Sequence, residues 1–219
     1  MKVLIACEES QRVCIEFRKK GHEAYSCDIE MCSGGHPEWH IMADVLPLLD
    51  GNCEFETADG SRHCITGNWD MIIAHPPCTY LSNAGARWLY KGGNLNEDRY
   101  KKGLAAKEFF EKFLNVACEK VVVENPIPSS VYELPKYTQV IQPYEHGEPW
   151  SKKTCLWVKG VKPLKPSNIV SDCKPYCSSG SYSGTHDPKY KGASRKGGSA
   201  KSRSKTFLGI AKAMAEQWG

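Results

Sequence analysis

A cysteine follows two prolines at the end of an apolar run in the middle of the chain. The run "WDMIIA" ends at Ala74, and "HPPC" then places Cys78 directly after Pro76 and Pro77. Proline fixes the backbone and removes an N–H donor, so a central strand cannot continue here. We therefore expect the thiol at a rigid, exposed corner, where a helix N-terminus or a nearby cation that lowers its pKa would make it a nucleophile. Core packing is the structural alternative for this cysteine.

A second apolar run, "VVVENP", ends in an acid. It carries Glu124 and Asn125 and stops at a proline. If it forms a strand beside "WDMIIA", its carboxyl group lies near Cys78. A thiol and a carboxyl group can then act on one ring, the first attacking a carbon and the second protonating a nitrogen. A carboxylate that caps a loop amide is the structural alternative for Glu124.

The elements that must position these two groups alternate along the chain. Short apolar runs predict strands, and apolar residues at helical spacing predict helices. The expected strands are 2–6, 22–30, 39–45, 69–74, 120–126 and 154–160; the expected helices are 10–21, 97–119 and 204–218; and 51–68 is an expected hairpin that turns at "DG". The apolar face of the middle helix is predicted to include Leu104, Phe109 and Phe113. This alternation predicts an α/β fold, a mostly parallel sheet with helices on both faces.

Reactive side chains gather at the predicted strand ends. "CEES" follows the first strand, "CDIE" ends the second, and "HPPC" and "VENP" stand at the ends of two later ones. Ligands bind at the carboxyl ends of the strands in such sheets. We therefore expect these clusters to converge on one site.

Composition narrows the class of protein. The length of 219 residues suits one domain, and 41% hydrophobic residues suffice for a core. No apolar stretch is long enough to span a membrane, and the start, "MKVLIACEES", does not have the pattern of a signal peptide. Eleven irregularly spaced cysteines favour free thiols in a reducing compartment, so we expect a cytoplasmic protein without a membrane partner.

The net charge of +4 conceals an asymmetry. Residues 159–206 carry eleven Lys and Arg but two Asp, a net charge of +9, which leaves −5 on the rest of the chain. A basic stretch on an acidic body favours a nucleic acid as partner, with a solvated loop as the alternative. Residues 165–203 are rich in Ser, Gly, Lys and Pro without a hydrophobic period, which predicts a long loop or a partly disordered arm.

A metal site is a weaker interpretation of the cysteines and histidines. Cys32, His36 and His40 lie close together in the sequence, and Cys173 and Cys177 are four apart. A Cys-x3-Cys spacing without a second pair nearby is a poor zinc signature, so we expect no metal.

The motifs resemble those of the cytosine-5 DNA methyltransferases, and the compact layout is similar to their small phage and prophage members. "PPCTYLSNAG" resembles the family's catalytic loop, and "ENP" its Glu-Asn-Val motif. "VLIACEES" occupies the place of the adenosylmethionine loop, and "CDIE" and "MADV" match acidic ends of the next strands. "SKKT", residues 151–154, lies where the family has paired arginines, and "RSKTFLGIAKAMA" is similar to its last motif.

The resemblance implies a fold, a reaction and a set of residues. The fold is the Rossmann-like fold of adenosylmethionine-dependent methyltransferases, formed by residues 1–158 with 203–219. The reaction is methyl transfer from S-adenosylmethionine to carbon 5 of cytosine in DNA, in the cytoplasm of a bacterium or of a phage-infected host. The implied catalytic residues are Cys78, Glu124, Asn125, Lys152 and Thr154. The implied cofactor-binding residues are Ala6, Cys7, Glu8, Ser10, Gln11, Asp28, Ile29, Asp44, Val45, Pro76, Ser204 and Thr206.

The sequence also departs from the family. Cys7, Glu8 and Glu9 replace its glycine-rich loop, and Lys152 and Thr154 replace its paired arginines. The large target-recognition domain of full-sized members is reduced to the basic segment 159–202, which is expected to contact DNA phosphates, while a second subunit or partner protein would supply sequence recognition. The same fold acting on a free pyrimidine nucleotide or on RNA, or an inactive DNA-binding or decoy protein, are the alternatives.

Overall fold

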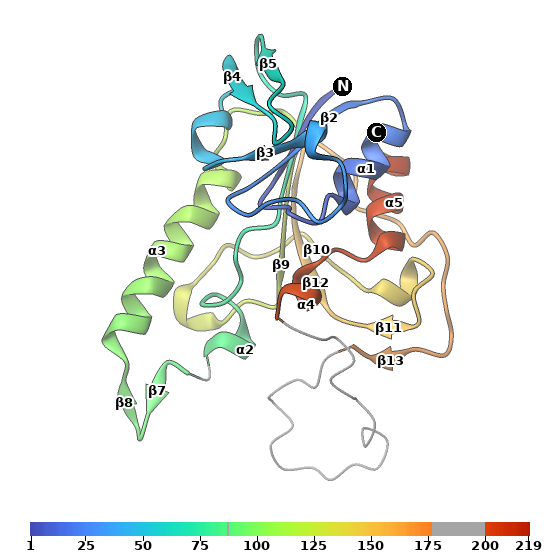
Figure 1. The fold of residues 1–219 in the computed structure, drawn as a ribbon. Coiled ribbons are helices and arrows are strands. Elements are labelled where there is room, and N and C mark those ends of the chain that lie inside the picture. The colour runs from blue at the N-terminus through green and yellow to red at the C-terminus, as the bar shows by residue number, and fades with distance from the viewer. Residues whose placement is uncertain (87, 177–199) are drawn as a thin grey trace.

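The computed structural model describes residues 1–86, 88–176 and 200–219 (Figure 1). Its centre is a sheet with the strand order β10-β12-β9-β6-β1-β2-β3. The strands are β1 (Lys2–Ala6), β2 (Glu23–Asp28), β3 (His40–Met42), β6 (Met71–Ala74), β9 (Val121–Pro126), β10 (Gln139–Ile141) and β12 (Thr154–Lys159). β3, β2, β1, β6 and β9 run parallel to one another, whereas β12 runs antiparallel between β9 and β10. The predicted mostly parallel sheet is confirmed.

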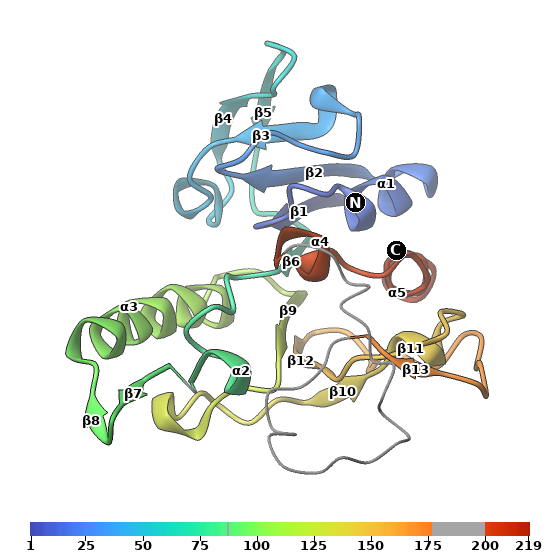
Figure 2. The same ribbon diagram turned by 60° about the horizontal axis from the view of Figure 1, so that its bottom comes forward.

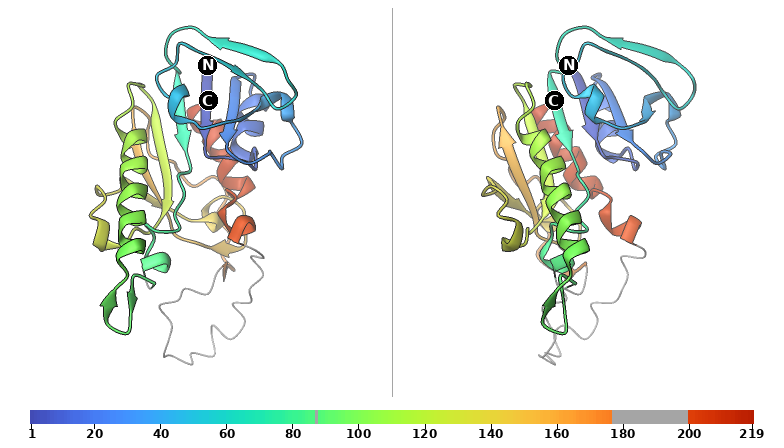
Figure 3. Two further views of the ribbon diagram at one scale, coloured as in Figure 1. Left: turned by 60° about the vertical axis from the view of Figure 1, so that its left-hand side comes forward. Right: turned by 90° about the vertical axis from the view of Figure 1, so that its left-hand side faces the viewer.

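Helices cover both faces of this sheet, as expected. Figure 1 shows α3 (Glu97–Leu114) on one side and α1 (Arg12–Lys19) with α5 (Leu208–Trp218) on the other, and both views of Figure 3 agree. Alternate residues of β1 serve the two faces: Leu4 packs in the cluster that contains Phe110 of α3, and Val3 in the one that contains Met214 of α5. A sheet buried on both sides explains the continuous apolar runs in its strands.

Smaller elements surround this core. The predicted hairpin is confirmed as β4 (Cys53–Glu56) and β5 (Arg62–Ile65), and β7 (Tyr90–Lys91) with β8 (Asn94–Leu95) forms another. β11 (Trp150–Ser151) pairs with β13 (Lys174–Pro175). The remaining elements are α2 (Asn83–Ala86), α4 (Ala200–Ser204) and the 3-10 helices η1 (Pro37–Trp39), η2 (Leu46–Leu48), η3 (Ser130–Tyr132) and η4 (Pro143–Glu145).

The middle helix differs in two details from its prediction. It ends at Leu114 rather than at residue 119, and Leu104 is exposed. Gly103, next to Leu104, faces inward instead, because a Cβ atom there would come within 2.1 Å of the Tyr132 ring. The close approach of η3 thus rotates the buried face of α3, which includes Phe110 as well as Phe113.

The basic segment is described in part. Residues 159–176 and 200–202 are described, and the stretch from Cys177 to residue 199 lies outside the described residues. β13 and α4 are the regular elements in the described portion of the predicted 165–203 arm. In Figure 2, α4 lies in front of the sheet near the ends of β1 and β6. None of the described helices has the length and apolar character needed to cross a membrane.

The strand order reverses at β1, which has β6 on one side and β2 on the other. Such a switch point leaves a crevice outside the carboxyl ends of the strands. This topology, with one antiparallel strand inserted near the edge, is that of the Rossmann-like methyltransferase fold. A fold of this kind does not by itself establish an activity.

Candidate active site

The register of β6 and β9 brings the predicted Glu124 and a second residue, His75, to the same edge. Ala74 pairs with Val123, so His75, which follows β6, lies level with Glu124, which is still within β9 and pairs with Leu156 of β12 on its other side. The Nδ1 atom of His75 lies 3.0 Å from Oε2 of Glu124. Only 8% of the His75 side chain and 15% of the Glu124 side chain are exposed. The two form a hydrogen-bonded pair shielded from water.

The charges of this pair are coupled. Burial alone would lower the pKa of His75, but the hydrogen bond and charge of Glu124, with the charge of Glu8, raise it above its ordinary value. Burial alone would raise the pKa of Glu124, but His75 and then Lys152 lower it. The imidazolium and the carboxylate therefore stabilise each other.

Cys78 lies three residues beyond His75 in a pinned loop. The side chain of Asn125 donates a 2.8 Å hydrogen bond from Nδ2 to the Pro76 carbonyl, and the Arg99 guanidinium donates one of 3.2 Å to the Thr79 carbonyl. The backbone N–H of Ser82 donates to the Cys78 carbonyl, and α2 starts at the next residue. The rigid corner that the prolines predicted is present.

The exposure of the thiol was predicted wrongly. Cys78 is half-buried, not exposed. Burial raises the pKa of its thiol, the charge of Glu124 raises it further, and the charge of Lys152 lowers it only in part. The carboxyl group that the sequence placed beside the thiol therefore opposes its ionisation as long as that group is charged.

A pocket beside Glu124 collects further predicted residues. Lys152 and Thr154, which precede and begin β12, meet there with the segment that leads into α5. The Lys152 ammonium donates a 2.8 Å hydrogen bond to the Arg203 carbonyl, and the Thr154 hydroxyl donates one of 3.3 Å to the Lys152 carbonyl. The lining residues are Glu124, Lys152, Thr154, Ser204, Lys205, Thr206, Phe207 and Ile210. Three separate parts of the chain, at 124, 152–154 and 204–210, thus line one pocket.

Several of the residues predicted to bind a cofactor lie in the loop after β1, where their side chains stabilise the loop itself. Ala6 ends the strand in the core, and Cys7 has a φ of 58°, in the left-handed region. The carboxylate of Glu8 accepts the backbone N–H groups of Val13 at 2.7 Å and Cys14 at 3.2 Å. These are orphan amides of the first turn of α1, so Glu8 acts as a cap from a distance.

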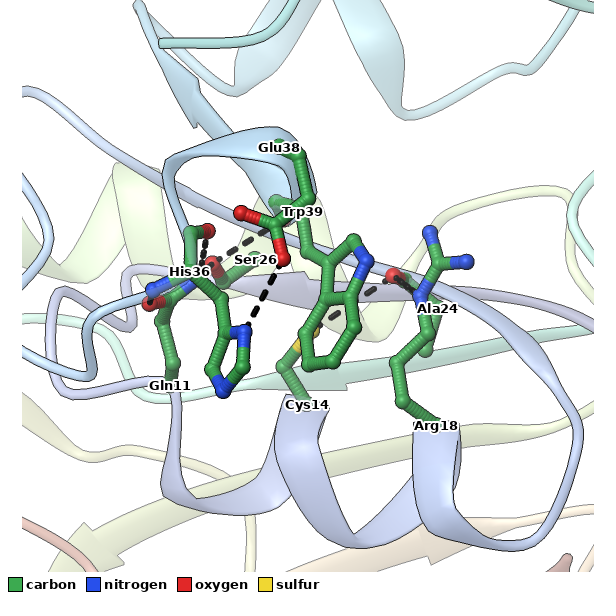
Figure 4. Close-up of polar contacts among 8 residues, drawn as sticks. All are labelled: Gln11, Cys14, Arg18, Ala24, Ser26, His36, Glu38 and Trp39. Atoms are coloured by element: carbon green, nitrogen blue, oxygen red, sulfur yellow. Dashed lines mark hydrogen bonds and ion pairs between the residues drawn. The ribbon is translucent and has the colours of Figure 1, made fainter. Parts of the chain in front are cut away.

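Gln11 is fully buried and has a φ of 58°. Its amide nitrogen donates to the His36 carbonyl at 2.8 Å and to the Ser26 hydroxyl at 3.3 Å, and its oxygen accepts from the His36 N–H (Figure 4). Because the side chains of Glu8 and Gln11 are engaged in this way, a ligand could reach these residues only through their backbone. Ser10, between them in the chain, is also buried.

The acidic residues at the ends of β2 and β3 face the same region. Asp28 accepts the Glu30 N–H at 3.0 Å, and Asp44, which is exposed, accepts the Leu46 N–H at 3.0 Å. Both charges act on the thiol of Cys7, whose pKa is raised by burial first and by these carboxylates next. The next residue along the chain differs in exposure: Ile29, after Asp28, is 80% exposed, whereas Val45, after Asp44, is buried.

The segment after the undescribed residues crosses this acidic edge. Lys201 pairs with Glu30, and the Lys205 ammonium lies 3.5 Å from Oε1 of Glu9 and donates to the Ser33 hydroxyl at 2.7 Å. Both carboxylate oxygens of Glu9 are buried without a hydrogen-bond partner in the described part of the chain. Part of the positive charge of the basic segment is therefore used within the protein.

Sequence reasoning missed His75, Glu9 and Lys205. His75 stands directly before the two prolines, and only the strand register reveals its contact with Glu124. Glu9 belongs to the "CEES" cluster and was recognised only as a departure from a glycine-rich loop. A buried carboxylate that forms an ion pair but accepts no hydrogen bond among the described residues is a feature of tertiary structure that the residue type does not reveal.

The two histidines of the possible metal site make other contacts, and Cys32 and Cys173 are free thiols. His36 contacts Glu38 at 2.9 Å and stacks on Trp39 (Figure 4), and His40 contacts the Ser26 hydroxyl and the Glu30 carbonyl. Over residues 1–86, 88–176 and 200–219, no group of three or more candidate ligands gathers. Cys177 lies outside the described residues, so its pairing with Cys173 is untested.

Comparisons with known proteins give similarity to solved structures alone. No protein-family model matches the sequence, and no curated protein matches it. Among solved structures, the chain is similar to an E. coli protein proposed to be a DNA modification methyltransferase and encoded within a prophage, with a TM-score of 0.40 and 12% identity. The similarity covers 77% of this chain and 51% of that one, so the chain spans about half the length of that neighbour.

Proposed function

We propose that the protein transfers a methyl group from S-adenosylmethionine to carbon 5 of cytosine in DNA, through a covalent adduct with Cys78. The observation that carries this proposal is the meeting of the Cys78 loop and Glu124 at the ends of neighbouring parallel strands. Glu124 lines the pocket that Lys152 and Thr154 share and its charge acts on Cys78, and a nucleophile with a proton donor near it suits addition to an electron-poor ring.

The reaction follows from these two groups. A cytosine in duplex DNA must first leave the base stack. The Cys78 thiolate attacks ring carbon 6, the electron pair of the 5,6 double bond moves into the ring, and Glu124 protonates nitrogen 3. Carbon 5, now nucleophilic, takes the methyl group. A base then removes the proton from carbon 5, the bond between sulfur and carbon 6 breaks, Cys78 leaves as a thiolate, and the proton on nitrogen 3 returns to Glu124.

Lys152 and Thr154 complete the pocket around the base. Lys152 is the cation that favours ionisation of Cys78 against the effect of Glu124. Its ammonium and the Thr154 hydroxyl are hydrogen-bond donors at the wall that Glu124 also lines. We assign them to the carbonyl oxygen of the base or to a phosphate, which accept such donors.

The residues at the ends of β1, β2 and β3 fit S-adenosylmethionine, which supplies an electrophilic methyl group on a sulfonium. Asp28 and Asp44 offer carboxylate acceptors for the ribose hydroxyls and the adenine amine, and the exposed Ile29 offers an apolar surface beside them. The buried oxygens of Glu9 accept no hydrogen bond within the described residues, although Oε1 lies 3.5 Å from the Lys205 ammonium, so they can accept one from the amino group of a ligand. Ser204 and Thr206 add hydroxyl groups at the pocket of Glu124.

DNA is the substrate that the charge distribution favours. Lys201 and Lys205 are held by acids of the protein, so phosphate contacts are assigned to the other cations of 159–206. Lys162, Lys165 and Lys174 are exposed, and Lys189, Lys191, Arg195 and Lys196 lie outside the described residues. Phosphate contacts of this kind position a protein without reading sequence, which leaves recognition to a second subunit or partner.

Duplex DNA that contains 5-fluorocytosine tests this function, because fluorine at carbon 5 blocks the final elimination. With S-adenosylmethionine, the protein is expected to form an adduct with this DNA that survives denaturing electrophoresis. Cys78→Ser should abolish the adduct, and Cys64→Ser, at an exposed cysteine, should retain it. If the adduct persists in both variants, another cysteine is the nucleophile.

The same assay separates the alternatives. An adduct only with fluorinated RNA, or only with a fluorinated nucleotide, would change the substrate and keep the chemistry. Absence of an adduct on all three, with no binding of S-adenosylmethionine by calorimetry, would leave a protein without this activity.

A further inference from the structure

His75 is a buried titratable group that the proposed reaction does not use. It directly follows β6, and the acids whose charges act on it come from elsewhere in the fold: Glu124 from β9 and Glu8 from the loop after β1. Its Nδ1 atom is bonded to Glu124 at 3.0 Å, while its Nε2 atom is buried without a hydrogen-bond partner in the described part of the chain. An imidazole that served only to orient a carboxylate would need a single N–H.

The charges around this ring favour its protonated form. Glu124 and Glu8 are both buried, and both act on the ring. Two carboxylates in a region shielded from water are costly unless a cation lies near them. His75 lowers the pKa of each of them, although burial keeps that of Glu8 above its ordinary value. The ring thus supplies a positive charge to two acids at once.

A second buried histidine shows what the carboxylates contribute. His146 is also buried with Nε2 unpartnered among the described residues, and its Nδ1 atom lies 3.1 Å from the Ser167 hydroxyl. Burial lowers its pKa, and no carboxylate among the described residues contributes to that shift. The two histidines are therefore expected to differ in charge at neutral pH, although both are shielded from water.

Glu124 faces a difficulty that His75 can resolve. The proposed reaction needs a proton on the carboxyl group at the moment when ring nitrogen 3 becomes basic, but the carboxyl is ionised at rest because His75 and Lys152 lower its pKa. A donor in direct contact with Glu124 can supply that proton without exchange with solvent. Among the described residues, His75 is the hydrogen-bond donor to this carboxylate.

We propose that His75 is a positioning residue that stores the proton for Glu124, as an imidazolium hydrogen-bonded to that carboxylate. This proposal rests on the proposed function. As the Cys78 thiolate bonds to carbon 6, one proton leaves Nδ1 of His75 for the Glu124 carboxyl group, which delivers it to nitrogen 3. Neutral imidazole and carboxylate remain. When Cys78 is eliminated, the proton returns along the same route, so the cycle consumes none.

Several other groups bear on the titration of this pair. Lys152, ahead of β12, lowers the pKa of both Glu124 and His75. Cys78 and Cys155 are thiols whose pKa values are raised by burial first and by Glu124 next. Ionisation of Cys78 and protonation of His75 are therefore linked through the one carboxylate between them.

NMR of the full-length protein with isotope-labelled histidine tests the stored proton directly. His75 is expected to remain protonated above the ordinary histidine pKa of about 6.5, whereas His146 in the same sample is expected to be neutral at pH 7. Glu124→Gln should shift the His75 titration to lower pH. A neutral His75 at pH 7 in the unmodified protein would overturn the proposal, and this measurement does not depend on activity.

His75→Gln then tests the role, because its amide can still donate a hydrogen bond to Glu124 but cannot carry the charge. The rate of adduct formation on 5-fluorocytosine DNA is expected to fall by at least about tenfold at pH 8, and the alkaline limb of its pH profile should move to lower pH. His146→Gln should change neither. Equal losses at every pH would mean that His75 has a purely structural role and would refute the proposal.

The outcomes separate the two levels of inference. An unmodified protein without adduct formation removes the proposed function, and the role of His75 with it. An active protein in which His75→Gln behaves as the unmodified one removes only the role of His75. Urea denaturation of each variant shows whether a slow variant is folded. If His75→Gln is unfolded, His75→Asn, a shorter amide, is measured in its place.

Discussion

Asn125 donates a 2.8 Å hydrogen bond from its side chain to the carbonyl of Pro76, so the residue after Glu124 holds the loop that carries Cys78. The bond joins the ends of β6 and β9 beyond their last paired residues, Ala74 and Val123. It fixes the thiol relative to the carboxyl group even though neither takes part in the bond. The Oδ1 atom of Asn125 is buried without a hydrogen-bond partner in the described structure, so this oxygen is available to accept a hydrogen bond from a ligand.

Asn125→Ala should therefore destabilise the protein, because it leaves the Pro76 carbonyl unsatisfied in a buried position. A cost of about 1 to 3 kcal/mol is expected. Urea denaturation measures it. Asn115→Ala removes a side-chain bond of 2.9 Å to the Glu111 carbonyl at an exposed helix end, and should cost less. Equal losses in both variants would argue against a special role for the loop contact.

Gly103→Ala should also destabilise the protein, because the added Cβ atom would lie 2.1 Å from the Tyr132 ring. Overpacking of this kind costs about 1 to 3 kcal/mol. Leu104→Ala, at a residue that is 38% exposed, is the matched control and should change stability by about 0.5 kcal/mol or less. A larger loss of stability in Leu104→Ala would indicate that Leu104 is buried, as the sequence predicted.

The sequence predicted the main strands because each is an apolar run buried on both faces, a pattern that needs no tertiary information. It did not predict β10, β11 and β13, which are short and gain their identity from the strands that they pair with. The rotated face of α3 is a further example. Helical spacing allows neighbouring positions to face the core, and the nearby Tyr132 ring decides in favour of Gly103.

In the candidate site, too, the local sequence pattern predicts some features and tertiary contacts decide the others. Cys78 and Glu124 could be found because prolines end their strands and set them apart from core residues. The sign of the shift in the Cys78 pKa could not be found, since it depends on burial and on the ionisation of Glu124. The engagement of Glu8 with the amides of α1, and of Gln11 with His36, likewise depends on where the chain returns.

Asp44→Ala should weaken binding of S-adenosylmethionine by about 1 kcal/mol, because the adenine amine loses its acceptor. Titration calorimetry measures the change. Asp59→Ala is the control, since Asp59 is an exposed acid in the turn of the β4–β5 hairpin, where it accepts from Thr57 and Ser61. Unchanged affinity in Asp44→Ala would place the adenine elsewhere, and no binding by the unmodified protein would end the proposal of a methyltransferase.

Affinity for duplex DNA should fall steeply with salt if the basic segment contacts phosphates. Deleting residues 178–198 removes Lys189, Lys191, Arg195 and Lys196 but keeps Lys201 and Lys205, which contact acids of the protein. The slope of log K against log salt should become shallower by up to about 3 to 4. Fluorescence anisotropy over a salt series measures it. A slope unaffected by the deletion would place the DNA surface on other elements.

Glu124→Gln should have opposite effects on two reactions of Cys78. Burial and the charge of Glu124 raise the pKa of the thiol, so alkylation by iodoacetamide should be slow at pH 7 and should accelerate as the pH rises. The glutamine removes the negative charge, which lowers the pKa of Cys78 and should speed alkylation by at least about threefold at neutral pH. Adduct formation on 5-fluorocytosine DNA should slow strongly, because the amide cannot protonate nitrogen 3.

Lys152→Met should slow alkylation, since it removes the cation that favours the thiolate. Mass spectrometry of the Cys78 peptide follows alkylation apart from the other cysteines, with the exposed Cys64 as the internal standard. If Glu124→Gln slowed both reactions, Glu124 would be acting on the shape of the loop rather than on the charge of the thiol.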